Sequence, residues 1–286
     1  MNPVVYHIAS GQAFFTGCTL IILAALLSLS QSKLARRGMG LAFLLGVIAV
    51  VVSSTPLPWW LYGVLGIVTL IWLLVQFRKS KQRGLSYAVI VVWLAAVGWE
   101  LPFHLLPHVG PVEDQSLTVI GDSVTAGLGD PKTTTWPVLL KHEHGLTVQD
   151  LSRVGATVAS AKKQVAENGI ESHLVLLEIG GNDILGSTTP AEFETGLEQL
   201  LAELAVPGCQ LVMLELPLPP FYNSFGLIQR KLARKYGVKL VPKRVFLSVL
   251  VGGGATLDSI HLSQAGHQQM ANVVWEIVGP AYPPSS

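Results

Sequence analysis

The chain has 286 residues, of which 50% are hydrophobic and 13% are charged, and its formal net charge is +1. An ordinary soluble domain carries about 25% charged residues, so this composition argues against a conventional soluble protein, a disordered chain and a collagen-like repeat. The charge is also unevenly divided. Residues 1–110 hold seven basic residues and one acid, a balance of +6, whereas residues 111–286 hold twelve basic residues and seventeen acids, a balance of −5. We therefore expect two domains, over residues 1–105 and 106–286.

The first domain consists mainly of long apolar stretches. No charged residue precedes Lys33, and 40 uncharged residues separate Arg37 from Arg78, which is enough for two membrane crossings of about 20 residues each. Pro56 and Pro58 divide that segment. The pattern predicts an all-α transmembrane region of four helices, over residues 13–30, 38–54, 59–77 and 84–101.

The basic residues of this region predict its orientation. They lie in the first and third connections between the helices, and the second connection has none. The positive-inside rule then places the N-terminus and residues 106–286 on the extracytoplasmic, periplasmic side of an inner or plasma membrane. A cleaved signal peptide is the alternative for the first helix, but no basic segment precedes it and its apolar stretch is long.

Few titratable or thiol side chains accompany these helices. Glu100, His104 and His108 fall at the outer end of the fourth helix, where we interpret them as solvated interfacial groups. Cys18 lies in the middle of the first helix and Cys209 in the second domain, so we expect no disulfide between them.

From residue 111 on, short apolar runs alternate with amphipathic stretches. This alternation predicts a parallel sheet with helices on both faces, a three-layer α/β fold whose ligands bind beyond the carboxyl ends of the strands. The start of one helix is marked by the capping box Thr189-Pro190-Ala191-Glu192. The predicted strands are 117–120, 146–152, 173–180, 210–216 and 238–241, and the predicted helices are 134–143, 157–168, 190–205, 223–236 and 263–277.

Two polar groups near predicted strand ends are typical of nucleophilic catalysis. Gly121, Asp122 and Ser123 follow the first strand, where a glycine turn would present the serine hydroxyl beside a helix start. Near the C-terminus, Asp258 and His261 are three residues apart, a spacing that lets the carboxylate hold one imidazole nitrogen while the other faces a serine. By itself, Gly-Asp-Ser is also ordinary turn chemistry.

A third group follows the third strand. Gly180 and Gly181 allow close approach of a ligand to the backbone, and the Asn182 amide can donate to a developing oxyanion. The alternative is a loop that only turns the chain. We interpret Asp183, like Asp122, as structuring its loop. His267, in the last predicted helix, is interpreted as a surface or packed residue without a catalytic role.

Taken together and in this order, these groups of residues resemble the conserved sequence blocks of the SGNH (GDSL-type) hydrolases, and the resemblance covers residues 116–278. The glycine block is Gly155 in "LSRVGATVAS", which lacks the asparagine often found upstream. Within the family, the segment "LELPLPPFYNSFGLIQRKLARKYGVKLVP" is similar to thioesterase I / lysophospholipase L1-like enzymes. The resemblance implies a flavodoxin-like sheet and a serine hydrolase acting on ester bonds.

The resemblance also implies a role for each matched residue. Ser123 would attack the acyl carbonyl, His261 would take its proton, and Asp258 would orient the imidazole. The oxyanion hole would comprise the N–H groups of Ser123 and Gly155 and the Asn182 side chain. No cofactor and no metal ion are expected.

The sequence defines the acyl group of the substrate less well than the catalytic residues. We interpret "PLPPFYNSFG" (217–226) and "VFLSVLVGGG" (245–254) as apolar loops, which either cover the sheet edge or place Phe221, Tyr222 and Leu247 along an acyl-chain trough. With a membrane anchor, the second possibility favours lipid or long-chain esters. The alternatives are an acetyl- or acyl-esterase or transferase acting on cell-envelope glycans, and an inactive lipid-binding scaffold. The expected partners are the lipid bilayer and an acyl ester; the −5 balance disfavours nucleic acid, and protein partners are undetermined.

Overall fold

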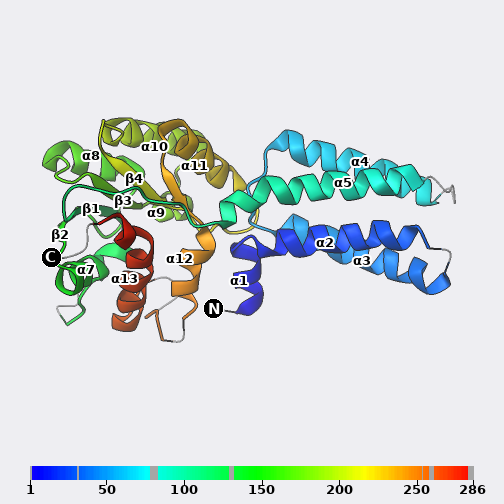
Figure 1. Cartoon of the computed structure of the whole chain (residues 1–286), viewed down its shortest axis with the longest axis horizontal. Helices are drawn as coiled ribbons and strands as arrows, with labels where there is room; N and C mark the ends of the chain where they lie inside the picture. Colours follow the sequence, from blue (N-terminus) through cyan, green and yellow to red (C-terminus); the bar gives the residue numbers. More distant parts are fainter. Residues whose placement is uncertain are drawn as a thin grey trace. The chain divides into compact units, whose positions relative to one another are not determined.

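The computed structural model describes residues 2–30, 32–77, 83–128, 132–252, 254–257 and 261–282 (Figure 1). Its contacts divide the chain into two compact units. The helical unit comprises Pro3–His104 together with Pro219–Asn223, and the hydrolase unit comprises chiefly Leu105–Leu218 and Ser224–Ser286.

Apolar helices make up the helical unit. A sharp bend of 84° at Ser10 and Gly11 separates the first two of them, where Gly11 adopts a positive φ of 83° that favours glycine. The helices are α1 (Pro3–Ala9), α2 (Gln12–Ser28), α3 (Lys33–Val52), α4 (Trp59–Phe77) and α5 (Arg83–Glu100), followed by the 3₁₀ turn η1 (Leu101–His104).

Three helices among the described residues are long and apolar enough to cross a membrane, and a fourth is added if the bent pair α1–α2 counts as one span. This number agrees with the four apolar stretches of the sequence. Helix α3 begins earlier than predicted, at Lys33, because the Ser32 side chain caps it by accepting from the Leu34 N–H. The basic residues of the first connection therefore lie in the first turns of α3.

The interpretation of Glu100 as a solvated group is wrong. Its side chain is fully buried at the end of α5, and Oε1 lies 3.3 Å from Nε2 of His104, one helical turn further on. The His104 ring also packs edge-on against Phe15 of α2. A buried carboxylate requires polar partners, and the i, i+4 spacing supplies one.

A five-stranded, all-parallel sheet in the order β2-β1-β3-β4-β5 organises the hydrolase unit. The chain starts in β1 and adds β2 on one side and then β3 to β5 on the other, so the strand order reverses between β1 and β3. In such sheets, ligands bind at this switch point. The strands are β1 (Ser116–Gly121), β2 (Thr147–Asp150), β3 (Leu174–Glu178), β4 (Gln210–Leu214) and β5 (Lys239–Val241).

Helices cover both faces of this sheet, as predicted (Figure 1). The face with α8, α10 and α11 encloses one continuous core that includes Ile120, Leu177 and Met213 of the sheet. The alternate strand residues, such as Val119 and Leu176, are also buried and point to the opposite face of the sheet. Helices α7 and α13 lie on that face (Figure 1). The longer helices are α7 (Trp136–His144), α8 (Val158–Asn168), α10 (Pro190–Leu204), α11 (Asn223–Tyr236), α12 (Lys243–Leu250) and α13 (Gln264–Val278); α6 (Ser123–Ala126) and α9 (Gly181–Leu185) are single turns, and η2 (Gly279–Ala281) follows α13.

The expectation of an apolar loop over 245–254 is wrong for most of that segment. Residues Lys243–Leu250 form α12, which packs against α13 and buries Phe246, Leu247 and Val249. Cys18 and Cys209 are both free thiols.

Candidate active site

Ser123 is the first residue of α6, immediately after β1 at the switch point. Asp122 caps this short helix, because its Oδ1 accepts from the Val124 N–H at 2.9 Å. The turn is tight: a Cβ on Gly121 would overlap the Thr125 side chain, so only glycine fits between strand and helix. As a result, Ser123 is fixed at the strand tip, with 7% of its surface exposed.

His261 lies opposite this serine. Its Nε2 is 3.2 Å from Ser123 Oγ, although the two residues are 138 positions apart in the chain. With the proton on Nδ1, Nε2 accepts the hydrogen bond from the hydroxyl, which is the arrangement that a general base requires. Asp258, the predicted third member, lies outside the described residues.

The asparagine and glycine blocks meet beside this pair. The Asn182 amide nitrogen, in α9 after β3, donates to Ala156 O at 3.0 Å and to Asp122 Oδ2 at 3.3 Å. Gly155 precedes Ala156 and has a φ of +75°, a conformation that favours glycine. The loops after β1, β2 and β3 are thus joined through the Asn182 amide.

Two aspartates support these loops. Burial raises the pKa of Asp122, while its hydrogen bond from Val124 and the nearby His261 oppose the rise. Asp183 accepts from the Val158 N–H at 2.9 Å and so ties α9 to the start of α8; burial also raises its pKa. Both contacts are structural, as the sequence interpretation of these residues supposed.

The sequence reasoning missed Glu178 and Thr125. Glu178 ends β3, is 2% exposed, and accepts from Thr125 Oγ1 at 2.8 Å. The signal was an acid at the end of a wholly apolar run, "LVLLE", which places a carboxyl group at the buried end of a central strand.

The predicted trough residues differ in environment. Phe221 and Tyr222 are exposed and belong to the segment that groups with the helical unit, whereas Leu247 is buried on α12 in the hydrolase unit. A joint role of the three side chains stays a prediction.

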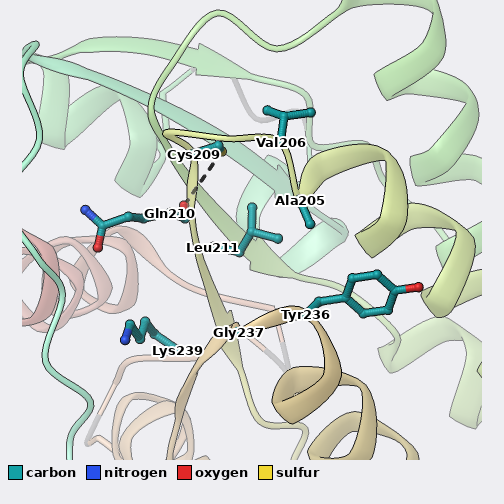
Figure 2. Close-up of a pocket in the computed structure, with 8 residues that line it drawn as sticks. All are labelled: Ala205, Val206, Cys209, Gln210, Leu211, Tyr236, Gly237 and Lys239. Atoms are coloured by element: carbon teal, nitrogen blue, oxygen red, sulfur yellow. Dashed lines mark hydrogen bonds between the residues drawn. The ribbon is translucent and has the colours of Figure 1, made fainter.

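A pocket with a volume of about 190 Å³ lies at the opposite edge of the sheet from Ser123, at the amino ends of β4 and β5. Cys209, Tyr236 and Lys239 are in its wall (Figure 2). Burial raises the pKa of the Cys209 thiol, which disfavours the reactive thiolate. Within the described ranges, no group of three or more His, Cys, Asp or Glu side chains could hold a metal ion.

A doubly wound parallel sheet with a serine–histidine pair at its switch point defines a class, the α/β serine hydrolases. Comparison with known proteins gives the family. Residues 119–269, more than half of the chain, match the GDSL-like Lipase/Acylhydrolase family. The chain belongs to this family and is a serine hydrolase that acts on ester bonds.

Proteins similar to this chain are named as esterases and thioesterases. The chain is 28% identical over 180 residues to Esterase TesA of Pseudomonas aeruginosa, an alignment that covers 58% of this chain and 89% of that protein. It is also 28% identical over 162 residues to thioesterase 1/protease 1/lysophospholipase L1 of Escherichia coli K12, which covers 50% and 74% of the two chains. The crystal structure of TesA matches with a TM-score of 0.50 at 28% identity, over 58% of this chain and 99% of that one.

Proposed function

We propose that the chain is a membrane-anchored serine esterase that hydrolyses lipid or other long-chain acyl esters through an acyl-serine intermediate. Residues 1–105 would form the anchor and residues 106–286 the catalytic domain. The observation that carries the catalytic part is the 3.2 Å contact between Ser123 Oγ and His261 Nε2 at the switch point of the sheet.

The proposed reaction has two steps. In the first, His261 Nε2 takes the proton of Ser123 while Oγ bonds to the acyl carbon, and the same proton is then given to the leaving alcohol or thiol. In the second, His261 takes a proton from a water molecule that attacks the acyl carbon, and it gives this proton to Ser123 Oγ as the bond between Oγ and the acyl carbon breaks and the acid is released. We assign Asp258 the role of holding Nδ1 of His261, from its position three residues upstream.

The carbonyl oxygen becomes an anion in both steps. The proposed donors are the N–H groups of Ser123 and Gly155 and the amide of Asn182. Ser123 is the first residue of α6, so its N–H has no acceptor within that helix. The Asn182 amide is held beside this loop by Ala156 and Asp122, and donation to the oxyanion would replace its longer bond, the one to Asp122. Loss of one such donor costs about 2.7–4 kcal/mol of transition-state stabilisation.

Apolar side chains around these loops support a lipid substrate. Leu128 follows the Ser123 block, Val154 precedes Gly155, Leu185 ends α9, and Leu257 lies four residues before His261; all four are more than half exposed. Exposed aliphatic side chains beside each catalytic block are typical of a surface that contacts an apolar substrate.

Phe221 provides a second indication. It is 78% exposed and has a φ of +72°, a backbone conformation that is unfavourable for a residue with a bulky side chain. Strained residues of this kind concentrate at ligand-binding segments. We propose that Phe221 and Tyr222, with Leu247, contact the acyl chain.

The first experiment compares the full-length protein with Ser123→Ala on p-nitrophenyl esters of graded chain length, lysophospholipids and acetylated glycans. We expect kcat/KM of the variant to fall by about a thousandfold or more, because the nucleophile is lost. Ser116→Ala, at the other end of β1, is the matched control and should retain activity. Equal activity of the wild type and Ser123→Ala on every ester would overturn the proposal, and activity confined to acetylated glycans would favour the glycan alternative.

The second experiment tests the chain-length preference with Phe221→Ala. A trough residue should affect long-chain esters several-fold more than acetyl esters, because only a long chain reaches it. Val206→Ala removes an exposed apolar side chain just before β4, at the other edge of the sheet, and serves as control. Equal losses on short and long esters would contradict the role of Phe221.

A further inference from the structure

Glu178 is a buried acid whose ionisable neighbour is another acid. It is the last residue of β3 and pairs in register with Gly121 at the end of β1, two residues before the nucleophile. Burial is the main cause that raises the pKa of Glu178 well above its ordinary value, and the charge of Asp122 adds to it. A carboxyl group in this position is neutral under conditions in which an exposed glutamate is ionised.

One oxygen of Glu178 connects the residues on both sides of Ser123. Its Oε2 accepts from Thr125 Oγ1 at 2.8 Å and from the Asp122 N–H at 3.4 Å. The same N–H also donates to the Glu178 backbone carbonyl at 3.2 Å. The strand end and the nucleophile turn are therefore joined by three hydrogen bonds that converge on one side chain and its backbone.

The two acidic side chains adjoin, because Oε2 of Glu178 accepts from the Asp122 N–H and the charge of Asp122 acts on Glu178. Two ionised carboxylates repel when they adjoin in a buried site, and one shared proton removes the repulsion. Asp122 accepts from the Val124 N–H and the Asn182 amide, which favour its ionised form. A shared proton is therefore held by Glu178, where it can be donated to Asp122.

From this arrangement we infer that Glu178 is a positioning residue that acts as a neutral carboxylic acid: it donates to Asp122, accepts from Thr125, and through them holds Ser123 and the Asn182 amide in place. The inference rests on the proposed roles of Ser123 and Asn182. It assigns a function to a side chain that touches neither the substrate nor His261.

A pH dependence follows from this role. Raising the pH through the elevated pKa of Glu178 removes the shared proton and leaves two adjacent buried carboxylates, which repel. The bond to Asp122 is then lost, and Asp122 no longer holds the Asn182 amide in a fixed position. Among the described residues, the other charged groups that act on Asp122 are Asp183, which also disfavours its ionisation, and His261, which favours it.

The decisive variant is Glu178→Gln, measured in the full-length protein with a soluble short-chain ester. Glutamine can accept from Thr125 through its oxygen and donate to Asp122 through its nitrogen, so it copies the protonated acid but does not titrate. We expect kcat/KM within about threefold of wild type at neutral pH. The ratio of variant to wild-type activity should rise as the pH is made alkaline, because only the wild type loses the proton.

Glu178→Leu removes every hydrogen bond of the side chain, to Thr125 and to Asp122, at similar volume. We expect kcat to fall by about tenfold or more with little change in KM, because the nucleophile and the oxyanion donor are displaced while substrate contacts remain. Thr125→Val deletes only one bond and should show a smaller loss of kcat. If Glu178→Leu does not fold, the pH profile of Glu178→Gln decides by itself.

Glu215→Gln is the matched control. Glu215 is also buried, directly after β4, but its Oε1 lies 2.7 Å from Nε of Arg230, so its amide variant removes a negative charge that pairs with this buried cation. We expect a lower unfolding temperature and an unchanged pH profile of the remaining activity. Identical alkaline profiles of Glu178→Gln and wild type, or equal losses in Glu178→Gln and Glu178→Leu, would overturn the inference. Full activity of Ser123→Ala would instead overturn the proposed function.

Discussion

Buried titratable side chains in the hydrolase unit are accommodated in three different ways. Glu178 pairs with another acid, and Glu215 pairs with Arg230. His267 on α13 is fully buried, and its Nδ1 accepts from the Trp136 N–H at 3.3 Å; none of the residues that the structure describes forms an ion pair with it. That bond requires the neutral imidazole with its proton on Nε2. The sequence interpretation of His267 as a surface or packed residue is resolved in favour of packing.

His267 predicts acid sensitivity of the fold. Burial lowers its pKa below the ordinary value of about 6.5, so the unfolded chain binds its proton more readily than the folded protein. This contribution to stability is complete above the unfolded pKa and is lost as the pH falls toward the folded one. His267→Asn keeps an acceptor for Trp136 but does not titrate, and its unfolding temperature should decline less on acidification.

The control for this measurement is His142→Asn, which removes an exposed imidazole on α7. Its unfolding temperature should follow the wild type at every pH. An acid decline in His267→Asn as steep as in wild type would show that other groups cause the sensitivity.

At the scale of elements, the contact between α2 and α3 depends on two glycines. A Cβ on Gly17 would lie 2.7 Å from the Gly46 carbonyl oxygen and 2.6 Å from Val50 Cγ2. A Cβ on Gly46 would in turn lie 2.8 Å from Ile21 Cγ1. Close backbone approach at small residues is a recurrent way in which apolar helices associate.

We therefore expect Gly17→Leu to separate α2 from α3 and to lower the unfolding temperature of the full-length protein in detergent. Gly66→Leu on α4 is the matched control, because no atom lies within 4 Å of its added Cβ. A loss of stability that is no greater for Gly17→Leu than for Gly66→Leu would contradict the packing role of these glycines.

At the scale of the whole molecule, the uneven charge has a directional consequence. The balance of +6 lies in the region of apolar helices and is concentrated in two of its connections, and the balance of −5 lies in the catalytic region. The positive-inside rule relates such an asymmetry to orientation in the bilayer. We propose that both basic connections face the cytoplasm and that the N-terminus and the hydrolase unit lie outside.

A reporter that is active only outside the cytoplasm tests this topology. Fused after Ser286 it should be active, and inserted in the basic connection near residue 80 it should be inactive. Replacing Lys33, Arg36 and Arg37 by glutamine should reduce the difference, since these charges favour retention of their loop inside. An inactive C-terminal fusion in a well-expressed protein would overturn the orientation.

The secondary structure and the order of the catalytic motifs could be predicted from the sequence. Apolar periodicity predicted the parallel sheet and its flanking helices. The order of Ser123, Gly155, Asn182 and His261 indicated the family, and the first three motifs each follow the strand that positions them, β1, β2 and β3. The capping box at Thr189 marked the start of α10 in the same local way.

Helix α12 and the burial of Glu100 could not be predicted in this way. The segment that forms α12 contains β-branched valines, and this pattern alone is compatible with a strand or an extended loop. In the folded protein the segment is a helix that packs on α13, a contact that the local sequence does not indicate. Glu100 is buried by helices distant in sequence, so its position at a helix end predicted a solvent contact that the tertiary structure does not have.

The sequence by itself determined the class of chemistry, the order of its residues and the division into an apolar and a catalytic region, since these depend on composition and on contacts within a few residues. Only the tertiary structure decided how the site is held. The bond from Thr125 to Glu178 joins residues 53 positions apart, and the contact of Ser123 with His261 joins residues 138 apart. Such partners are selected by the packing of the sheet, which brings the ends of β1 and β3 together and buries Glu178, so that its pKa is raised.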